Sequence, residues 1–221
     1  MSHKHTNNPI PNAIRFAALA VDVVCFRVVQ NDLEVLLAKV TSEYNAYKGH
    51  WAHIGGLIRV DETAEQSVDR LLNQKGGIFH IYKEQLYTFS KIDRDPRGRV
   101  VSVAYIALTH PNHVQDFTNI ETETMWRSLT RLPKLAYDHD EITKIALDRL
   151  RTKITHTDIA KHCMPKEFTL SDLQKVYEVV LGEGMDKRNF RKRIVSLDIL
   201  KNTKRTLKKG VMRPAALYSF K

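Results

Sequence analysis

The amino-acid sequence predicts an α+β protein in two parts, a larger domain of mixed strands and helices followed by a smaller, basic helical domain. Three observations support this prediction. Runs rich in β-branched and aromatic residues alternate with an amphipathic helix over the first two thirds of the chain. Two capped helices joined by a glycine-containing turn follow near the end. The excess positive charge is confined to the last third.

The first domain is predicted from patterns between residues 14 and 129. An apolar run over 14–29 indicates a buried strand, 30–32 indicates a polar turn, and 33–40 indicates the returning strand. The later elements are expected as a strand at 51–58, a helix at about 63–75, and strands at 78–90, 99–109 and 125–129. This mixture is typical of a domain with helices packed on a sheet.

A helix over about 140–153 is expected to connect the two domains. Asp138 or Asp140 can cap its first turn, and its apolar positions repeat at helical spacing. His139 is interpreted as part of the helix start, because no nucleophile is recognisable near it. We therefore expect residues 1–150 to form the first domain and residues 151–221 the second.

The charge distribution indicates a polyanion partner for the second domain. From Arg151 onward there are seventeen Lys or Arg and seven Asp or Glu, whereas residues 1–150 contain eighteen of each kind. The whole net charge of +10 therefore lies in the last third. A neutral body with a basic appendage is typical of nucleic-acid binding. The alternative is a solvated basic face that serves only solubility.

Composition narrows the cellular setting. No apolar run approaches the ~18 residues of a membrane helix. The polar start is followed by no signal-peptide core, so we expect a cytoplasmic protein with no membrane partner. Cys25 and Cys163 fit no metal-site spacing and are interpreted as reduced thiols.

Two capped helices in the second domain predict a helix-turn-helix. Thr169 is an expected N-cap with Asp172 at the third helical position, and Asp186 is the expected cap of the next helix. Gly182 and Gly184 interrupt the chain between these helices. A wing is expected after them, with a short strand at 200–202, a basic loop at 204–210 and a strand at 213–220.

Basic side chains on the second helix and the wing are the predicted DNA contacts. At about 100° per residue, most of those on the helix point away from its apolar face. The predicted set is Lys187, Arg188, Asn189, Arg191, Lys192, Arg193, Lys204, Arg205, Lys208, Lys209 and Arg213. The alternative is a basic helical hairpin that binds another protein.

The segment from Gly56 to Ile78 resembles the signature of Nudix hydrolases. Six positions match the signature at its spacing: Gly56, Glu62, Arg70, Leu72, Gly77 and Ile78. The alternative is a chance match on an ordinary amphipathic helix, because the apolar positions already explain the helix as core packing.

The departures from this signature predict a domain that has lost its metal. Three positions that are glutamates in Nudix enzymes are Leu71, Gln74 and Lys75 here. Their spacing places them on one helix face, where those enzymes hold Mg²⁺ or Mn²⁺ and activate water. Glu62 and Glu65 remain, but they lie upstream of that face. We expect no catalytic residue and no metal, with Lys75 either replacing the metal's charge toward a phosphate or lying exposed.

A diphosphate-shaped cleft is expected to persist in this domain. The predicted ligand contacts are Lys39, Gly55, Gly56, Arg70, Arg97 and Arg99. Arginines around the turn at 94–99 suit forked hydrogen bonds to a diphosphate or a ribose. Arg97 and Arg99 rank above Arg70, which can instead pair with Glu62. The alternative for this turn is a solvated hairpin.

The order of these parts along the chain resembles the NrtR family, Nudix-related transcriptional regulators of bacterial NAD metabolism. The similarity is carried by the box at 56–78 and by the segments 94–105, 132–142, 168–178, 186–194 and 213–220. It implies a Nudix-like α/β/α sandwich followed by a C-terminal winged helix-turn-helix. It also implies a homodimer that represses NAD biosynthesis or salvage genes and leaves a palindromic operator in double-stranded DNA when ADP-ribose or a related nucleotide binds.

Two other functions compete with that of a regulator. The first is an ADP-ribose or nucleotide-sugar pyrophosphatase with an appended nucleic-acid-binding domain, against which Leu71, Gln74 and Lys75 argue. The second is an RNA-binding adaptor. The deep, narrow major groove of A-form RNA excludes a helix, so the helix-turn-helix favours duplex DNA.

Overall fold

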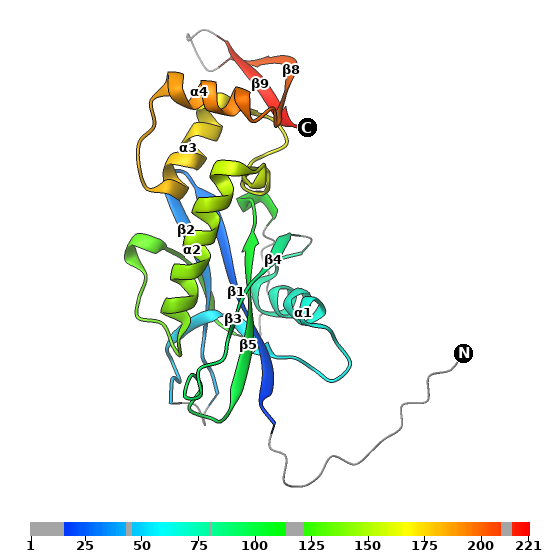
Figure 1. Ribbon diagram of the computed structural model, residues 1–221, viewed down its shortest axis with the longest axis vertical. Helices are drawn as coiled ribbons and strands as arrows, with labels where there is room; N and C mark the ends of the chain where they lie inside the picture. The colour runs from blue at the N-terminus through cyan, green and yellow to red at the C-terminus, as the bar shows by residue number, and fades with distance from the viewer. Residues whose placement is uncertain (1–15, 43–45, 80, 114–121, 209–213) are drawn as a thin grey trace, which may run out of the picture.

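The computed structural model describes residues 16–42, 46–79, 81–113, 122–208 and 214–221. Figure 1 shows an elongated molecule with a sheet domain at one end and a smaller domain containing the C-terminus at the other. Helix α2 runs along the molecule between them.

A six-stranded mixed sheet forms the first domain. Its strands are β1 (Ala18–Val29), β2 (Asp32–Lys39), β3 (Trp51–Leu57), β4 (Tyr82–Phe89), β5 (Val100–Leu108) and β6 (Thr124–Ser128). Their order across the sheet is β4-β5-β1-β3-β2-β6. β1 and β5 are parallel, and the other neighbours are antiparallel. The predicted strands are all present, so their apolar runs identified the sheet.

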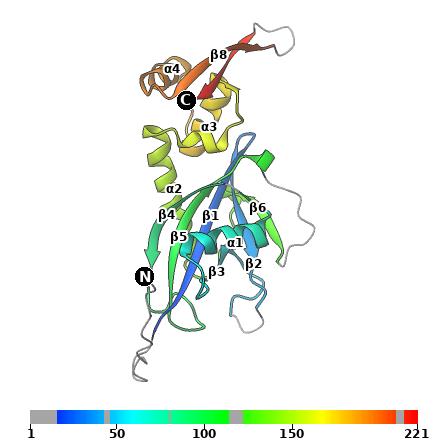
Figure 2. The ribbon, with the colours of Figure 1, turned by 90° about the vertical axis from the view of Figure 1, so that its right-hand side faces the viewer.

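Two helices cover opposite faces of this sheet, giving an α/β/α sandwich (Figure 2). Helix α1 (Ala64–Gly76) buries Val68 and Leu72 in one core layer, and helix α2 (His139–His156) buries Ile142 and Leu150 in the other. Short 3₁₀ helices η1 (Pro111–His113), η2 (Leu129–Arg131) and η3 (Ile159–Cys163) complete the connections. In this three-layer arrangement the ends of α1 and α2 lie beside the sheet.

The helix starts show which capping predictions hold. Thr63 and Gln66 form a reciprocal capping box on α1, which ends at Gly77 with φ of 60°. At α2 the predicted cap position is correct for Asp138 and wrong for Asp140, and no side-chain cap hydrogen bond forms. Asp138 occupies the cap position but makes no side-chain cap hydrogen bond, because both its oxygens accept from Arg94. Asp140 instead accepts the backbone N–H of Leu135.

The second domain has the expected pair of helices. Its elements are β7 (Phe168–Thr169), α3 (Leu170–Leu181), α4 (Lys187–Ser196), β8 (Leu200–Leu207) and β9 (Ala215–Phe220). Thr169 caps α3 through a capping box with Asp172, and Asp186 accepts from two backbone N–H groups of α4, as predicted. The short strand β7 was not predicted. It pairs with β9 in a three-stranded sheet of order β7-β9-β8.

The prediction that a basic loop starts at residue 204 is wrong in part. Lys204 and Arg205 lie inside β8, which pairs with β9 along most of its length. The pairing of β8 with β9 shifts in register between Asn202 and Thr206. Lys204 lies within this irregularity with a φ of 62°, and the strands pair again beyond it. Lys209 and Arg213 lie outside the described residues.

One apolar core runs through both domains. The cluster that contains Phe26 of β1 and Ile142 of α2 continues into Tyr177 of α3 and Phe190 of α4. The connector α2 is therefore packed against both domains along its length. Cys25 and Cys163 are buried, free thiols of this interior. Within the described ranges, every helix is too short or too polar to cross a bilayer.

Candidate ligand cavity and nucleic-acid interface

A cavity of about 210 Å³ opens between β1, β2, β3, the last turn of α1 and the start of α2. The turn over 94–97 closes one side of it. Its ionisable and aromatic lining includes Asp22, Lys39, His53, Lys75, Arg94, Asp95, Arg97, Tyr137 and His139. Such a mixture of cations and aromatic rings is suited to a phosphate-bearing nucleotide.

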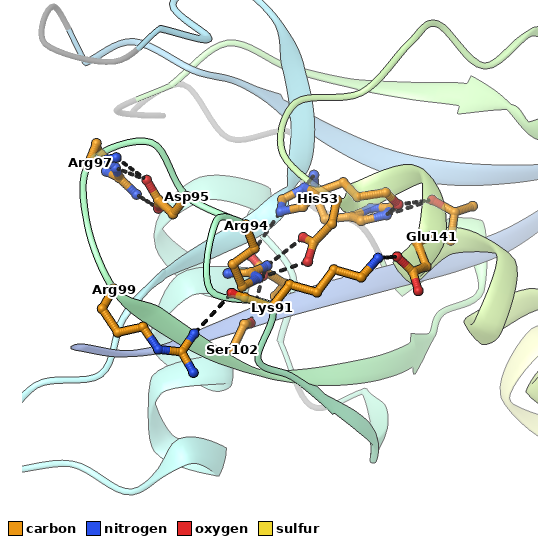
Figure 3. A network of polar contacts seen from close by, with 12 residues as sticks. His53, Lys91, Arg94, Asp95, Arg97, Arg99, Ser102 and Glu141 are labelled. Carbon is orange, nitrogen blue, oxygen red and sulfur yellow. Dashed lines mark hydrogen bonds and ion pairs between the residues drawn. The ribbon is translucent and has the colours of Figure 1, made fainter. Parts of the chain in front are cut away.

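A buried ionic network forms the floor of this cavity (Figure 3). The Arg94 side chain is 3% exposed, and its Nη2 lies 2.7 Å from Asp138 Oδ1 and 3.0 Å from Asp22 Oδ2. The Ser102 hydroxyl donates to the same Asp22 oxygen at 2.6 Å. Because these groups come from β1, β5, the 94–97 turn and the start of α2, the network ties four segments together.

Electrostatics keep this network ionised. Burial by itself raises the pKa of Asp22, but His139, Arg94 and Ser102 together bring that pKa well below its ordinary value. Burial lowers the pKa of Arg94, yet its carboxylate partners raise it overall. Asp22 and Arg94 are therefore a charged pair at neutral pH, with little exposure to water.

Two stacked histidines join β3 to the first turn of α2. The backbone N–H of His53 donates to His139 Nδ1 at 2.9 Å, and His53 Nε2 lies 2.8 Å from Thr143 Oγ1. Burial lowers the pKa of His53 to about 3. His53 is therefore neutral at physiological pH, and its contacts hold the start of α2 against the cavity wall.

Four of the predicted ligand residues lie around this cavity: Lys39, Gly55, Gly56 and Arg97. A Cβ atom on Gly55 would lie 2.2 Å from Asp22 Oδ1, so glycine is required for the carboxylate to pack there. Lys39 pairs with Glu123 at 2.8 Å. Arg97 pairs with Asp95 and lies 5.7 Å over the Tyr137 ring, which brings a guanidinium and an aromatic face together at the rim.

The structure places the other two predicted ligand residues outside the cavity. Arg70 makes a forked pair with Glu62 at 2.6 and 2.8 Å and donates to the Leu57 carbonyl, which fixes the loop before α1. Arg99 donates to the Lys91 carbonyl at 3.0 Å and points away from Arg97 (Figure 3). Both guanidinium groups hold loops in the structure.

Sequence reasoning missed the residues that build the cavity floor. Asp22, His139 and Tyr137 were not among the predicted contacts, and Arg94 entered only as one of the arginines of the turn at 94–99. A usable signal was present at Asp22, a carboxylate in the middle of an apolar strand, which needs a buried partner. The partner itself could not be chosen from spacing, because Arg94 is 72 residues away.

The helix face that binds metal in Nudix enzymes has no acidic ligand here. Leu71 is buried against Gly56, and Gln74 lies 3.4 Å from Arg70 Nη1. Lys75 Nζ donates to the Gly55 carbonyl at 2.7 Å. The two remaining glutamates are engaged, since Arg70 lowers the pKa of Glu62 to about 2 and Glu65 accepts from the Tyr105 hydroxyl. This donor set does not fit Mg²⁺, which requires anionic oxygen ligands.

Helix α4 exposes a basic face to solvent at the far end of the molecule (Figure 1). The exposed predicted contacts on it are Lys187, Arg188, Asn189, Arg191 and Lys192. Val195 lies among them and is 68% exposed. Exposed cations with one apolar side chain suit phosphates, base edges and a thymine methyl group.

Arg193 differs from its neighbours on α4. Its side chain is half-buried, and Nη2 donates to the Thr155 carbonyl near the end of α2 at 3.0 Å. In the wing, Arg205 forms an ion pair with Glu167, whereas Lys204 and Lys208 are exposed. Arg193 is thus engaged within the protein, whereas Arg205 remains 67% exposed beside its Glu167 partner and Lys204 and Lys208 lie at the surface.

Helix α2 links the cavity to the second domain. His139 at its first residue lines the cavity, and Arg151 near its other end donates to the Val180 carbonyl of α3 at 3.1 Å. Its 18 residues span about 27 Å. Lys153 also pairs with Glu84 of β4, so the helix is held by side chains of both domains.

This combination of an α/β/α cavity domain and a winged helix with a basic recognition helix defines a two-domain, ligand-responsive type of regulator. A Nudix domain model matches residues 18–147, and the model of the NrtR DNA-binding winged helix domain matches residues 160–220. The chain belongs to the NrtR family. The sequence resemblance and the fold class it implied are thereby confirmed.

Three relatives show how similar this chain is to known proteins. The ADPR-responsive transcriptional repressor NtrR of Acinetobacter baylyi is 34% identical over 206 residues, covering 91% of this chain and 81% of the relative. NrtR of Shewanella oneidensis, crystallised with a 27mer DNA, is 34% identical with a TM-score of 0.80, and the match covers 92% of this chain and 93% of that one. The crystallised Nudix domain of the same Shewanella protein with ADP-ribose is 34% identical with a TM-score of 0.56, and the match covers 65% of this chain and 94% of that one. ADP-ribose pyrophosphatase of Methanocaldococcus jannaschii is 34% identical over 127 residues, covering 58% and 71%.

Proposed function

We propose that this protein is a transcriptional repressor that binds double-stranded DNA as a homodimer and is released by ADP-ribose. The observation that carries the proposal is the position of α2, which begins at the cation-lined cavity and ends against the DNA-binding helices. The Acinetobacter and Shewanella relatives support the same assignment of both ligands. Its targets are genes of NAD biosynthesis or salvage with palindromic operators.

In this proposal the diphosphate of ADP-ribose binds among Lys39, Arg97 and the backbone at Gly55 and Gly56. Arg97 and Lys39 hold carboxylate partners in the free protein, and a phosphate can compete for the same N–H donors. The base lies beside the Tyr137 ring, which lines the cavity and contacts Tyr47 and His139. Ligand bound there contacts the segments that Arg94 joins to α2.

The DNA and the nucleotide act through conformation because their contacts lie at opposite ends of α2. Each subunit of the dimer presents one α4 to a major groove, and the half-sites lie about 34 Å apart or a multiple of that distance. A small rotation of α2 changes the spacing of the two recognition helices. One half-site then loses its contacts.

ADP-ribose is expected to lower operator affinity by about 5- to 150-fold, the usual range of allosteric coupling. Mobility-shift titrations on DNA upstream of NAD biosynthesis and salvage genes, with and without ADP-ribose, measure this factor. Linkage requires saturating operator duplex to weaken ADP-ribose binding by the same factor, which calorimetry measures. Equal ADP-ribose affinities with and without operator would reject the allosteric mechanism, and AMP is the ligand control.

We also propose that the domain does not hydrolyse ADP-ribose. The pyrophosphatase alternative has the Methanocaldococcus relative in its favour, but the three metal-binding carboxylates of such enzymes are Leu71, Gln74 and Lys75 here. A catalytic metal supplies several kcal/mol of transition-state stabilisation, at about 1.4 kcal/mol per tenfold in rate. Chromatography of ADP-ribose incubated with protein and Mg²⁺ or Mn²⁺ should show no AMP formation. Turnover on the order of 1 s⁻¹ would establish the enzymatic alternative.

A further inference from the structure

Positions 71, 74 and 75 of α1, where Nudix enzymes carry glutamates, hold no acidic side chain, and Lys75 places a cation there. Among the residues that the structure describes, no three His, Cys, Asp or Glu side chains are grouped so as to hold a metal ion. Lys75 lies in the last turn of α1, is half-buried, and lines the cavity. Its ammonium group is 2.7 Å from the Gly55 carbonyl, which also belongs to the cavity wall.

We propose that the Lys75 ammonium takes the place of the divalent cation of Nudix enzymes and binds the diphosphate directly, so that nucleotide binding requires no metal. This inference rests on the proposed ADP-ribose function and specifies the chemistry of its recognition. The ligand class is a nucleoside diphosphate linked to a sugar. Binding is carried by N–H donors of the protein, and no carboxylate–metal–phosphate bridge is formed.

The position of Lys75 is stable before a ligand arrives. A cation in the last turn of a helix is favoured by the helix dipole, and the left-handed cap at Gly77 ends α1 just beyond it. An ammonium has three N–H donors, so it can keep the Gly55 carbonyl and still reach a phosphate oxygen. The lysine is therefore held at the cavity wall in part by a neutral carbonyl, which a bound anion does not need to displace.

The neighbouring side chains exclude the alternative of a metal held in a new way. Leu71, one turn before Lys75, is 3% exposed and packs against Gly56. Asp22 and Asp95, the carboxylates among the described residues that line the cavity, are paired with Arg94 and Arg97. A divalent cation would have to displace an arginine and approach the ammonium of Lys75 at the same time, and both steps oppose its binding.

The test is calorimetry of ADP-ribose binding to the full chain, in excess EDTA and in millimolar Mg²⁺. Wild-type affinity is expected to be the same in both buffers. Lys75→Gln removes a charged hydrogen bond and is expected to weaken binding about 10- to 150-fold in both buffers. Lys75→Glu is expected to lose binding in EDTA and to regain part of it in Mg²⁺.

The matched control is Lys83→Gln, which removes a lysine that pairs with Asp69 on the surface outside the cavity. Its affinity should equal that of the wild type, and circular dichroism should show each variant folded. A tenfold or greater loss of wild-type affinity in EDTA, or wild-type binding by Lys75→Gln, would reject the inference and leave the ADP-ribose function standing. If the wild type binds ADP-ribose in neither buffer, both proposals are wrong.

Discussion

Replacing Arg188 and Lys192 together by alanine is expected to lower operator affinity by about 2–6 kcal/mol, or roughly 30-fold to more than 10⁴-fold. Both side chains are exposed on α4, one turn apart, on the face opposite the buried Phe190 and Ile194. A side chain that contacts a base edge contributes about 1–3 kcal/mol of discrimination. Fluorescence anisotropy with a labelled operator duplex measures the loss, and a duplex of scrambled sequence measures the non-specific component.

The matched control is Lys144→Ala, which removes an exposed lysine of α2 in the first domain and should leave affinity unchanged. Lys208→Ala in the wing should weaken binding to all sequences alike and reduce the slope of log affinity against log salt by about one. Wild-type operator affinity in the double variant would show that α4 does not read the major groove.

Replacing Arg94 by methionine is expected to lower the free energy of unfolding of the cavity domain by about 3–5 kcal/mol. The substitution leaves two carboxylates, each 9% exposed in its side chain, without their guanidinium partner. Asp22 is the more affected, because burial disfavours its charge and Arg94 is one of the groups that compensate. Urea denaturation followed by tryptophan fluorescence reports this domain, since Trp51 and Trp126 both lie in its strands.

Arg99→Met is the control on the adjoining segment, because Arg99 is exposed and its hydrogen bond to the Lys91 carbonyl should contribute about 1 kcal/mol or less. Adding Asp22→Asn to Arg94→Met removes one of the two unpaired buried charges and should recover part of the loss. Equal unfolding midpoints for Arg94→Met and Arg99→Met would show that the network contributes no special stability.

Local patterns in the sequence were sufficient to predict the helices and strands and much of the function. Apolar runs marked β1 and β5, and the caps at Thr169 and Asp186 marked the two DNA-binding helices. The residues at 71, 74 and 75 identified an altered metal face without any coordinates. These features depend on neighbours within one helix turn or one strand, so the physical interactions that produce them are visible in the order of residues.

The cavity floor and the coupling between domains depend on contacts between distant segments, which spacing does not encode. Asp22, Arg94 and Asp138 meet because three segments converge on one desolvated point, where a charge is stable only with its partners. The same argument applies to Arg193, which flanks the apolar face of α4 and was predicted to contact DNA. Its half-buried guanidinium instead donates to the end of α2, because folding brings an unsatisfied helix carbonyl within its reach.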